Sequence, residues 1–300
     1  GRKFMSEKLL IIANPCSGKG KAKKLAPKIA KRFSEYGYDV NLMYTNMRGD
    51  AKDFASAEDY SMVVAVGGDG TLNETINGVM VSGKNTNSLV GYIPMGSTND
   101  FASSMKIPTK WKKAVDVIAN GKDLCIDIAR FNDRYFTYVA GYGMFTQTSC
   151  TASQKLKNKL GHFAYLLLGV KEVFKKNNYP IKIEVDGELV EGEYAFLGFG
   201  NTKSIGGVLK FKDDIVEISD GKFEVLLVKY PKNLWHLSRM LKKFMKSDWQ
   251  GDGLTMLHGS KAKIYTDKEM LWSLDGEKLI INADAEIEMI NKAIKIRVGN

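Results

Sequence analysis

Three short stretches of the chain combine glycine, hydroxyl, amide and carboxylate groups in patterns that suit phosphate chemistry. They run from Asn14 to Gly20 (NPCSGKG), from Val66 to Thr71 (VGGDGT) and from Pro94 to Asp100 (PMGSTND). Glycine has no side chain, so backbone N–H groups can approach phosphate oxygens closely, and a following helix directs its partial positive charge at the same anion. The three stretches therefore predict a phosphate-binding site.

The second stretch places Asp69 between two glycines. Bare phosphate repels a carboxylate, so Asp69 is expected to act through Mg²⁺ or on an incoming hydroxyl. The alternative is that Asp69 only caps the next helix, because Asp is a favoured N-cap residue.

The first stretch lacks the Gly-x-x-x-x-Gly-Lys-[Ser/Thr] pattern of a P-loop. Seven Lys or Arg residues and no acid lie between Lys19 and Arg32, and they form either an anion-binding face or a solvated one.

Apolar runs and helical periodicity predict how these stretches are positioned. Strands are expected over 8–13, 39–44, 61–66 and 88–93, with helices over 21–36, 50–57, 72–81 and 109–120. Apolar strands joined by helices are typical of a parallel sheet covered on both faces. Ligands bind such sheets beyond the carboxyl ends of the strands, and each stretch follows a strand. All three are therefore expected to converge on one edge.

The pattern changes after Gly121. Ile181 to Val185 alternates apolar and polar residues before a hairpin signal at Asp186-Gly187. Further strands are expected over 223–228, 261–265, 271–274, 286–290 and 294–298, with helices over 154–176 and 233–246. The sequence thus predicts an α/β domain over 1–121 and a β-rich domain over 122–300, whose last strand could return to the first domain. A cleft between the two would be a usual place for a small-molecule site.

Composition narrows the classes of protein. With 44% hydrophobic and 26% charged residues among 300, the chain is neither disordered nor fibrous. A net charge of +10 favours an anionic partner such as a nucleotide, a phosphorylated metabolite or an acidic lipid surface. Cys16, Cys125 and Cys150 are too few for a disulfide framework, and no signal peptide is recognised, so a cytoplasmic location is expected. The longest apolar run, Phe163 to Val170, is far shorter than the roughly 20 residues of a spanning helix.

Together, the three stretches resemble the catalytic domain of diacylglycerol kinases, sphingosine kinases and their bacterial relatives. Gly-Gly-Asp-Gly alone is shared with NAD kinases and phosphofructokinases, but the other two stretches favour the lipid kinases. The resemblance continues through Asp127, residues 161–165, Asp220-Gly221 and residues 274–277, and is closest to the soluble bacterial enzymes. The motifs that carry it are Asn14-Pro15-x-Ser17-Gly18-x-Gly20, Gly67-Gly68-Asp69-Gly70-Thr71-x-Asn73-Glu74 and Pro94-x-Gly96-Ser97-x-Asn99-Asp100-Phe101.

This resemblance implies a nucleotide domain like those of NAD kinase and phosphofructokinase, a C-terminal β-sandwich, and ATP-dependent phosphorylation of a lipid hydroxyl. Glu277 is implied as the general base with Asp275 beside it, and which of the two takes the proton is left open; Asp69 is the third catalytic candidate. A structural Mg²⁺ is implied on Asp220 and the carbonyl groups of Glu217 and Lys222. The residues implied to hold ATP are Asn14, Pro15, Cys16, Ser17, Gly18, Thr45, Gly67, Gly68, Asp69, Gly70, Thr71, Leu72, Asn73 and Ser97.

Two departures from the family pattern bear on these expectations. Lys212-Asp213-Asp214 stands where relatives commonly have a Pro-x-Ala segment, which puts the structural Mg²⁺ site in doubt. Ser97 stands where relatives usually have Thr, a change that keeps the hydroxyl group.

A lipid kinase must meet its substrate at a membrane surface, and residues 233–246 are a candidate for that contact. Leu234, Leu237, Leu241 and Phe244 are expected on one side of this helix, and Arg239, Lys242, Lys243 and Lys246 on the other. Such a helix either lies in the membrane interface or packs on its own domain.

Two other functions stay open: a kinase of a soluble substrate, like NAD kinase, and a non-catalytic module that binds anions or membranes. Nucleic-acid binding is not expected, because no recognisable nucleic-acid motif is present. The sequence leaves the lipid and the oligomeric state, including a homodimer, undetermined.

Overall fold

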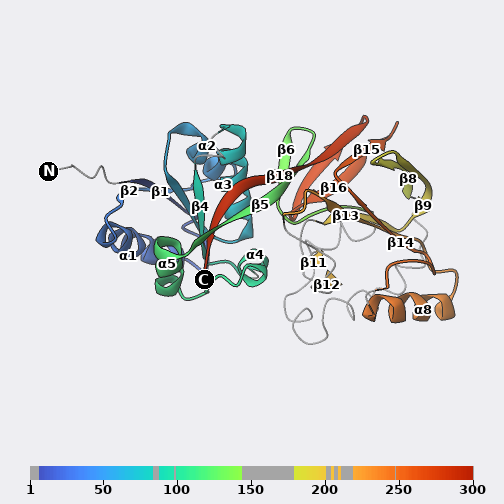
Figure 1. Ribbon diagram of the computed structural model, residues 1–300, viewed down its shortest axis with the longest axis horizontal. Helices are drawn as coiled ribbons and strands as arrows, with labels where there is room; N and C mark the ends of the chain where they lie inside the picture. Colours follow the sequence, from blue (N-terminus) through green and yellow to red (C-terminus); the bar gives the residue numbers. More distant parts are fainter. Residues whose placement is uncertain are drawn as a thin grey trace. The chain divides into compact units, whose positions relative to one another are not determined.

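The computed structural model describes residues 7–83, 88–97, 99–143, 179–200, 204–205, 209–210, 219–246 and 248–299 (Figure 1). The chain forms two compact units. The first comprises Gly1–Ile128 with Lys292–Asn300, and the second comprises Ala129–Asn291. The division between them falls inside β5 (Lys122–Phe131) and inside β18 (Ala285–Val298).

The first unit is an α/β domain built on parallel strands. β1 (Lys8–Ala13), β2 (Asp39–Tyr44), β3 (Met62–Gly67) and β4 (Leu89–Pro94) lie in the order β2-β1-β3-β4, and each neighbouring pair is parallel. Apart from Lys8, every residue of β1, β3 and β4 is buried. Strands covered on both faces need continuous apolar sequence, which is why their positions were predicted closely.

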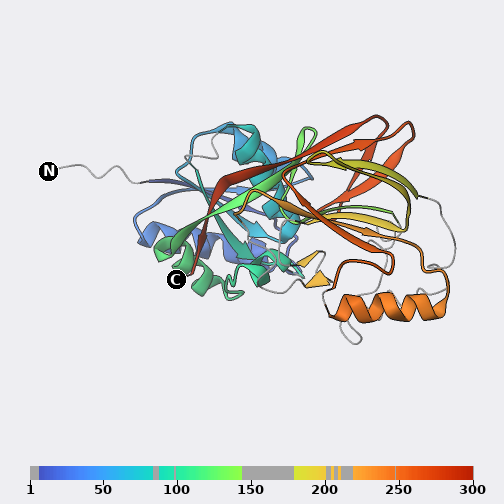
Figure 2. The same cartoon turned by 45° about the vertical axis from the view of Figure 1, so that its right-hand side comes forward.

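Helices cover both faces of these strands (Figures 1 and 2). α1 (Lys21–Glu35) and α5 (Trp111–Asn120) share one hydrophobic cluster with β1, β3 and β4, in which Phe33 and Ile118 are wholly buried. α2 (Asp50–Ala57) and α3 (Asp69–Val81) pack together on the opposite face. A short helix that the sequence did not predict, α4 (Asp100–Ser104), follows the third loop.

β18 contributes to both units. Lys295 and Ile296 pair in parallel with Leu89 and Val90 of β4 in the first unit. The earlier residues of β18 pair antiparallel with β15 (Lys261–Tyr265) in the second unit. Two separate strands were predicted here, but the structure has one, in which Lys292 adopts a positive φ of 48°. The Lys292 backbone N–H donates to the wholly buried carboxylate of Asp127 at 2.6 Å, which satisfies an otherwise costly buried charge.

The second unit is a β-sandwich. One sheet is antiparallel in the order β14-β13-β10-β7-β16-β17, and facing strands β9, β8, β15 and the first part of β18 form the other layer. The bounds are β6 (Arg134–Phe136), β7 (Val139–Gly143), β8 (Tyr179–Val185), β9 (Glu188–Tyr194), β10 (Phe196–Gly200), β11 (Ser204–Ile205), β12 (Leu209–Lys210), β13 (Phe223–Val228), α8 (Leu234–Met245), β14 (Leu254–Gly259), β16 (Met270–Leu274) and β17 (Glu277–Ile281).

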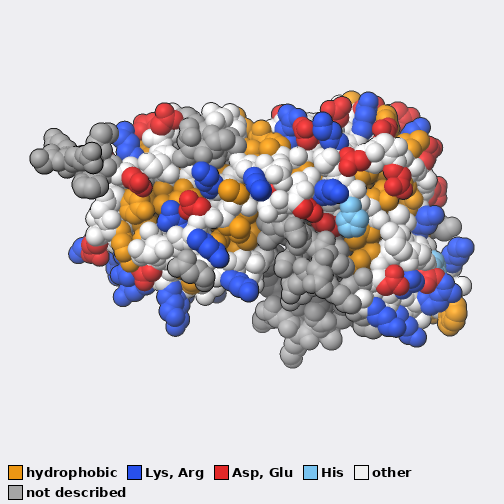
Figure 3. Space-filling view, viewed as in Figure 1, with side chains coloured by type: hydrophobic (Ala, Val, Ile, Leu, Met, Phe, Trp, Pro, Cys, Tyr) orange, Lys and Arg blue, Asp and Glu red, His pale blue; other side chains and the backbone are white. Residues whose placement is uncertain are grey.

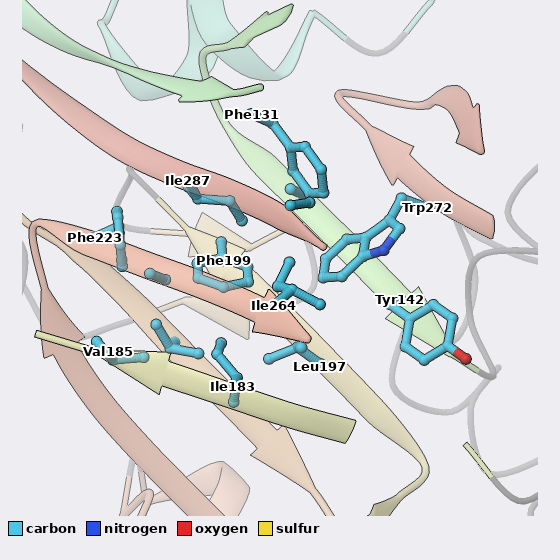
Figure 4. Packing of buried hydrophobic residues seen from close by; sticks show 14 of the residues in the cluster. Phe131, Tyr142, Ile183, Val185, Leu197, Phe199, Phe223, Ile264, Trp272 and Ile287 are labelled. Atoms are coloured by element: carbon cyan, nitrogen blue, oxygen red, sulfur yellow. The ribbon is translucent and has the colours of Figure 1, made fainter. Parts of the chain in front are cut away.

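Trp272 anchors the sandwich core (Figure 4). Its ring lies 5.1 Å from that of Phe131, 5.5 Å from that of Tyr142 and 6.1 Å from that of Phe199, measured between ring centroids. Ile264 and Ile287 of the facing layer belong to the same buried cluster. The predicted fold class, an α/β domain with a parallel sheet followed by a β-rich sandwich, is confirmed.

Among the residues the structure describes, none of the helices has the length and apolar character needed to cross a membrane. The helix predicted over 154–176 lies outside the described residues.

Candidate active site

The three loops of the first unit meet at the carboxyl ends of their strands. Asn14 donates its backbone N–H to Val66 O at 2.9 Å, and Met95 donates to Gly67 O at 2.6 Å. Thr45, after β2, donates to Ala13 O at 3.0 Å. These bonds hold the start of each loop against the end of a neighbouring strand, as the strand order predicts.

Close contact between the loops depends on two glycines. A Cβ atom on Gly96 would lie 2.7 Å from the Cα atom of Gly68, so any side chain there would push the second and third loops apart. Gly18 has a positive φ of 63°, and a Cβ atom there would lie 3.0 Å from Met95 O. The glycines thus bring the backbones of the three loops together.

Asp69 is half-buried at the start of α3. Its Oδ1 atom accepts from the backbone N–H of Phe101 at 3.3 Å and from the Tyr92 hydroxyl at 3.4 Å. Gly68 occupies the N-cap of α3, so Asp69 is not the capping residue that the alternative interpretation required. Its carboxylate instead links the second loop to the segment that follows the third.

Tyr92 is a residue that the sequence analysis missed. It is fully buried in β4, and its hydroxyl lies 3.4 Å from Gly67 O and 3.3 Å from Asn99 Oδ1. Asn99 in turn closes the third loop, accepting from Gly96 N at 2.8 Å. A buried tyrosine hydroxyl needs a polar partner, so a tyrosine within the apolar sequence of β4 was the one cue in the sequence to these contacts.

A cavity of about 860 Å³ opens beside the first and third loops. This volume lies within the usual range for small-molecule sites. Five lysines and the Trp111 side chain border it, so it is strongly cationic. Its lining residues are Gly18, Lys19, Lys21, Leu25, Pro94, Met95, Gly96, Ser97, Asn99, Thr109, Lys110, Trp111, Lys112 and Lys113.

The predicted nucleotide residues fall into two groups. Cys16 is exposed, while Asn14, Pro15, Ser17, Gly18 and Gly68 are half-buried in the loops. Gly70 and Ser97 are also exposed, and Asp69 is half-buried. The remaining five, Thr45, Gly67, Thr71, Leu72 and Asn73, are buried. Leu72 is 1% exposed and Asn73 accepts from the side chain of Asn77, so these two support α3.

The second unit has an acidic turn between β16 and β17. Asp275 and Gly276 have φ values of 47° and 89°, and Leu274 pairs with Glu277, which defines a two-residue hairpin loop. The Asp275 carboxylate accepts four hydrogen bonds: from the N–H groups of Thr137 (2.7 Å), Tyr138 (2.9 Å) and Val139 (2.9 Å), and from the Thr137 hydroxyl (3.0 Å).

Burial raises the pKa of Asp275 above its usual range, and the hydrogen bonds from Thr137, Val139 and Tyr138 oppose that rise. A carboxylate has about four acceptor positions, so these donors occupy it fully. The geometry makes Asp275 an anchor for the turn.

Glu277 begins β17 and its side chain is 18% exposed. The Arg134 guanidinium donates to Glu277 Oε2 at 3.0 Å. Arg134 begins β6, and the donors to Asp275 follow this strand directly, so the six residues from Arg134 to Val139 hold both carboxylates. Nothing in the sequence around Arg134 pointed to this contact.

Two of the implied metal residues, Asp220 and Lys222, lie just before β13. Asp220 is exposed, and its Oδ1 atom accepts from Lys222 N at 2.9 Å. Glu217 lies outside the described residues. Among the residues that are described, no group of three or more His, Cys, Asp or Glu side chains could hold a metal ion.

Glu224, which the sequence analysis did not single out, lies near this turn. It is 2% exposed, and burial raises its pKa to about 8, helped by the charge of Asp220.

Comparison with known proteins identifies the family. The family model for "Diacylglycerol kinase catalytic domain" matches residues 8–131, and that for "YegS C-terminal NAD kinase beta sandwich-like domain" matches residues 139–298. A protein of Staphylococcus carnosus named diacylglycerol kinase is 34% identical over 277 residues, which cover 91% of this chain and 89% of that protein. The chain belongs to the diacylglycerol kinase family.

A second relative and a solved structure are also similar to this chain. A Bacillus subtilis protein named diacylglycerol kinase is 32% identical over 272 residues, covering 89% of this chain and 88% of its own length. The crystal structure of a diacylglycerol kinase from Bacillus anthracis superimposes with a TM-score of 0.77, covers 99% of both chains, and is 24% identical. This similarity supports the two-domain fold described above.

Membership in the diacylglycerol kinase family confirms the resemblance given by the three loop motifs. It supports a kinase enzyme, and kinases of this kind use a nucleotide and usually a divalent metal ion.

Proposed function

We propose that this chain is an ATP-dependent lipid kinase, which transfers the γ-phosphoryl group of ATP to a hydroxyl of diacylglycerol or a related lipid. The product would be a lipid of the phosphatidic acid type. The meeting of three glycine-bearing loops beside a lysine-lined cavity is the observation that supports this proposal most strongly.

The loops and the lysines bind the triphosphate in this proposal. Backbone N–H groups at the start of α1 and α3 donate to phosphate oxygens, and Lys19, Lys21 and Lys110 neutralise their charge. Little covalent chemistry is needed from the protein, because positioning and charge neutralisation supply most of the catalysis of phosphoryl transfer.

Asp69 has the donor chemistry to hold Mg²⁺ beside the phosphates, because carboxylate oxygens are the ligands that this ion prefers. Mg²⁺ bound with the nucleotide neutralises charge that develops on the phosphate oxygens. The second, structural Mg²⁺ remains proposed on Asp220 and the carbonyl groups of Glu217 and Lys222.

Glu277 is the proposed general base. As the lipid oxygen bonds to the γ-phosphorus, the bond to the β–γ bridging oxygen breaks, ADP leaves, and Glu277 takes the hydroxyl proton. This requires Glu277 to come within about 3 Å of the hydroxyl in the reacting complex. Asp275 and Arg134 act as positioning residues, the first through the backbone of the turn and the second through the Glu277 side chain.

A label-transfer assay tests this function. The purified chain is incubated with Mg²⁺ and ATP labelled at the γ-phosphate, and is offered diacylglycerol in mixed micelles, NAD, or no acceptor. We expect labelled, chloroform-extractable lipid only with diacylglycerol or a related lipid in its place. Label in NADP would instead assign a soluble substrate, and label in no product from any acceptor would contradict the kinase assignment.

A further inference from the structure

The outer face of α8 combines basic and large apolar side chains. Trp235, Arg239 and Lys242 of α8, and Lys246 directly after its end, follow one another at intervals of four, three and four residues, so they share one side. Trp235 is 70% exposed, and Leu234 beside it is 68% exposed. The Arg239 guanidinium lies 5.1 Å from the centroid of the Trp235 ring.

The opposite face fixes α8 to its own domain. Met240 is 5% exposed, and together with His236 it lies against Gly253. The His236 ring accepts from Lys232 N at 3.0 Å and lies 3.0 Å from Asp252 O. Leu234 was expected on the same side as Leu237 and Leu241, but it is exposed, and the buried side is centred on Met240. Packing on the domain therefore leaves the outer face of α8 free for a partner.

The positive charges on and around α8 are only partly balanced by neighbouring acids. Arg239 pairs with Asp252, and Lys243 pairs with Asp248 at 2.7 Å. Among the described residues, Lys232, Lys242 and Lys246 form no ion pair with an acid, although the charge of Lys246 helps to lower the pKa of nearby Asp248. Figure 3 shows Lys and Arg side chains gathered over α8 beside an exposed hydrophobic group.

This combination fits one kind of partner best. Tryptophan and leucine side chains favour the boundary between headgroups and acyl chains, and lysines with free ammonium groups are attracted to anionic lipid phosphates. A polyanion such as nucleic acid would match the lysines but gain nothing from Leu234.

We infer that the outer face of α8, formed by Leu234, Trp235, Arg239, Lys242 and Lys246, docks on an anionic bilayer surface. Leu234 and Trp235 enter the headgroup region, and the lysines contact lipid phosphates. This inference rests on the proposed function, because a lipid kinase must reach a substrate that resides in a bilayer.

Vesicle sedimentation tests the docking. The whole chain is mixed with vesicles of phosphatidylcholine alone or with about 30% phosphatidylglycerol, which gives the surface a negative potential that attracts basic residues. Lys242→Glu/Lys246→Glu should weaken binding to the anionic vesicles by roughly tenfold or more. A matched double charge reversal on exposed α1 residues, Lys28→Glu/Lys31→Glu, should retain most of the binding. Equal loss in both variants would overturn the assignment to α8.

Trp235 supplies a second readout. Of the four tryptophans, Trp249 and Trp272 are buried, Trp111 is half-buried and Trp235 is exposed, so a blue shift of tryptophan fluorescence on adding anionic vesicles should come mainly from Trp235. Trp235→Ser should abolish that shift and weaken binding, while the circular dichroism melting curve stays unchanged because the side chain is exposed. Unchanged binding in Trp235→Ser would show a purely electrostatic face and contradict insertion.

Activity on a short-chain diacylglycerol below its micelle concentration separates this inference from the proposed function. The wild type and the α8 variants should phosphorylate that dissolved lipid equally, because no docking is needed. If the wild type phosphorylates it but α8 variants still bind vesicles normally, only the docking inference fails. If the wild type phosphorylates no lipid in any form, the proposed function fails.

Discussion

Replacing Glu277 with Gln is expected to lower kcat for lipid phosphorylation by roughly 10²- to 10⁴-fold, the usual contribution of a general base. Gln keeps the size of the side chain and can still accept the hydrogen bond from Arg134, but it cannot take up the hydroxyl proton. The KM for ATP should change little, because the residues proposed to bind ATP lie in the other unit. Steady-state label transfer gives both constants.

Asp275→Asn is the matched control for that variant. It replaces one carboxylate oxygen with an amide group that faces the N–H donors of Thr137 to Val139, so a fully buried charge network is broken. We expect a stability loss of about 1–3 kcal/mol together with lower turnover. Glu277→Gln should melt like the wild type. Wild-type turnover in Glu277→Gln, with turnover lost in Asp275→Asn at an unchanged melting temperature, would assign the base to Asp275.

Replacing Asp69 with Asn is the second change with a large expected effect. A carboxylate that would hold Mg²⁺ beside the phosphates stabilises the transition state by several kcal/mol through that ion, so kcat should fall by at least about 100-fold. The fold should survive, because an Asn oxygen can still accept from Phe101 N and the Tyr92 hydroxyl. Turnover at saturating ATP and Mg²⁺, measured beside a melting curve, checks this.

Tyr92→Phe provides the comparison for Asp69. It removes the hydroxyl beneath the second and third loops but leaves the carboxylate in place. We expect a stability loss of about 0.5–1.5 kcal/mol and a much smaller fall in kcat than for Asp69→Asn. If the two variants lost turnover equally, Asp69 would act by holding the loops together rather than by holding Mg²⁺.

The parallel strands of the first unit were predictable to within a residue because burial on both faces leaves an unbroken apolar sequence. The sandwich strands were harder. β9 is an edge strand with mostly exposed residues, and β7 and β10 each contain two glycines, so none showed clean alternation. β18 looked like two strands because the distortion at Lys292 places Ala293 and Ile294, two buried neighbours, in succession.

In the candidate site, too, local features were predictable and contacts between distant residues were not. Each loop follows a strand of one parallel sheet, so their meeting could be deduced from local sequence. Arg134 and Glu277 are 143 residues apart, and their contact depends on how β6 and β17 lie in the sandwich. The anchoring of Asp275 likewise needs the backbone N–H groups of Thr137 to Val139. Every residue except proline has such a group, so the residue types did not indicate this contact.

Hydrogen exchange followed by mass spectrometry tests most directly whether the three loops hold one triphosphate. A non-hydrolysable ATP analogue with Mg²⁺ should slow amide exchange together in peptides covering residues 14–20, 66–71 and 94–100, while the same concentration of adenosine should not. Protection of a single loop, or equal protection by adenosine, would contradict the account.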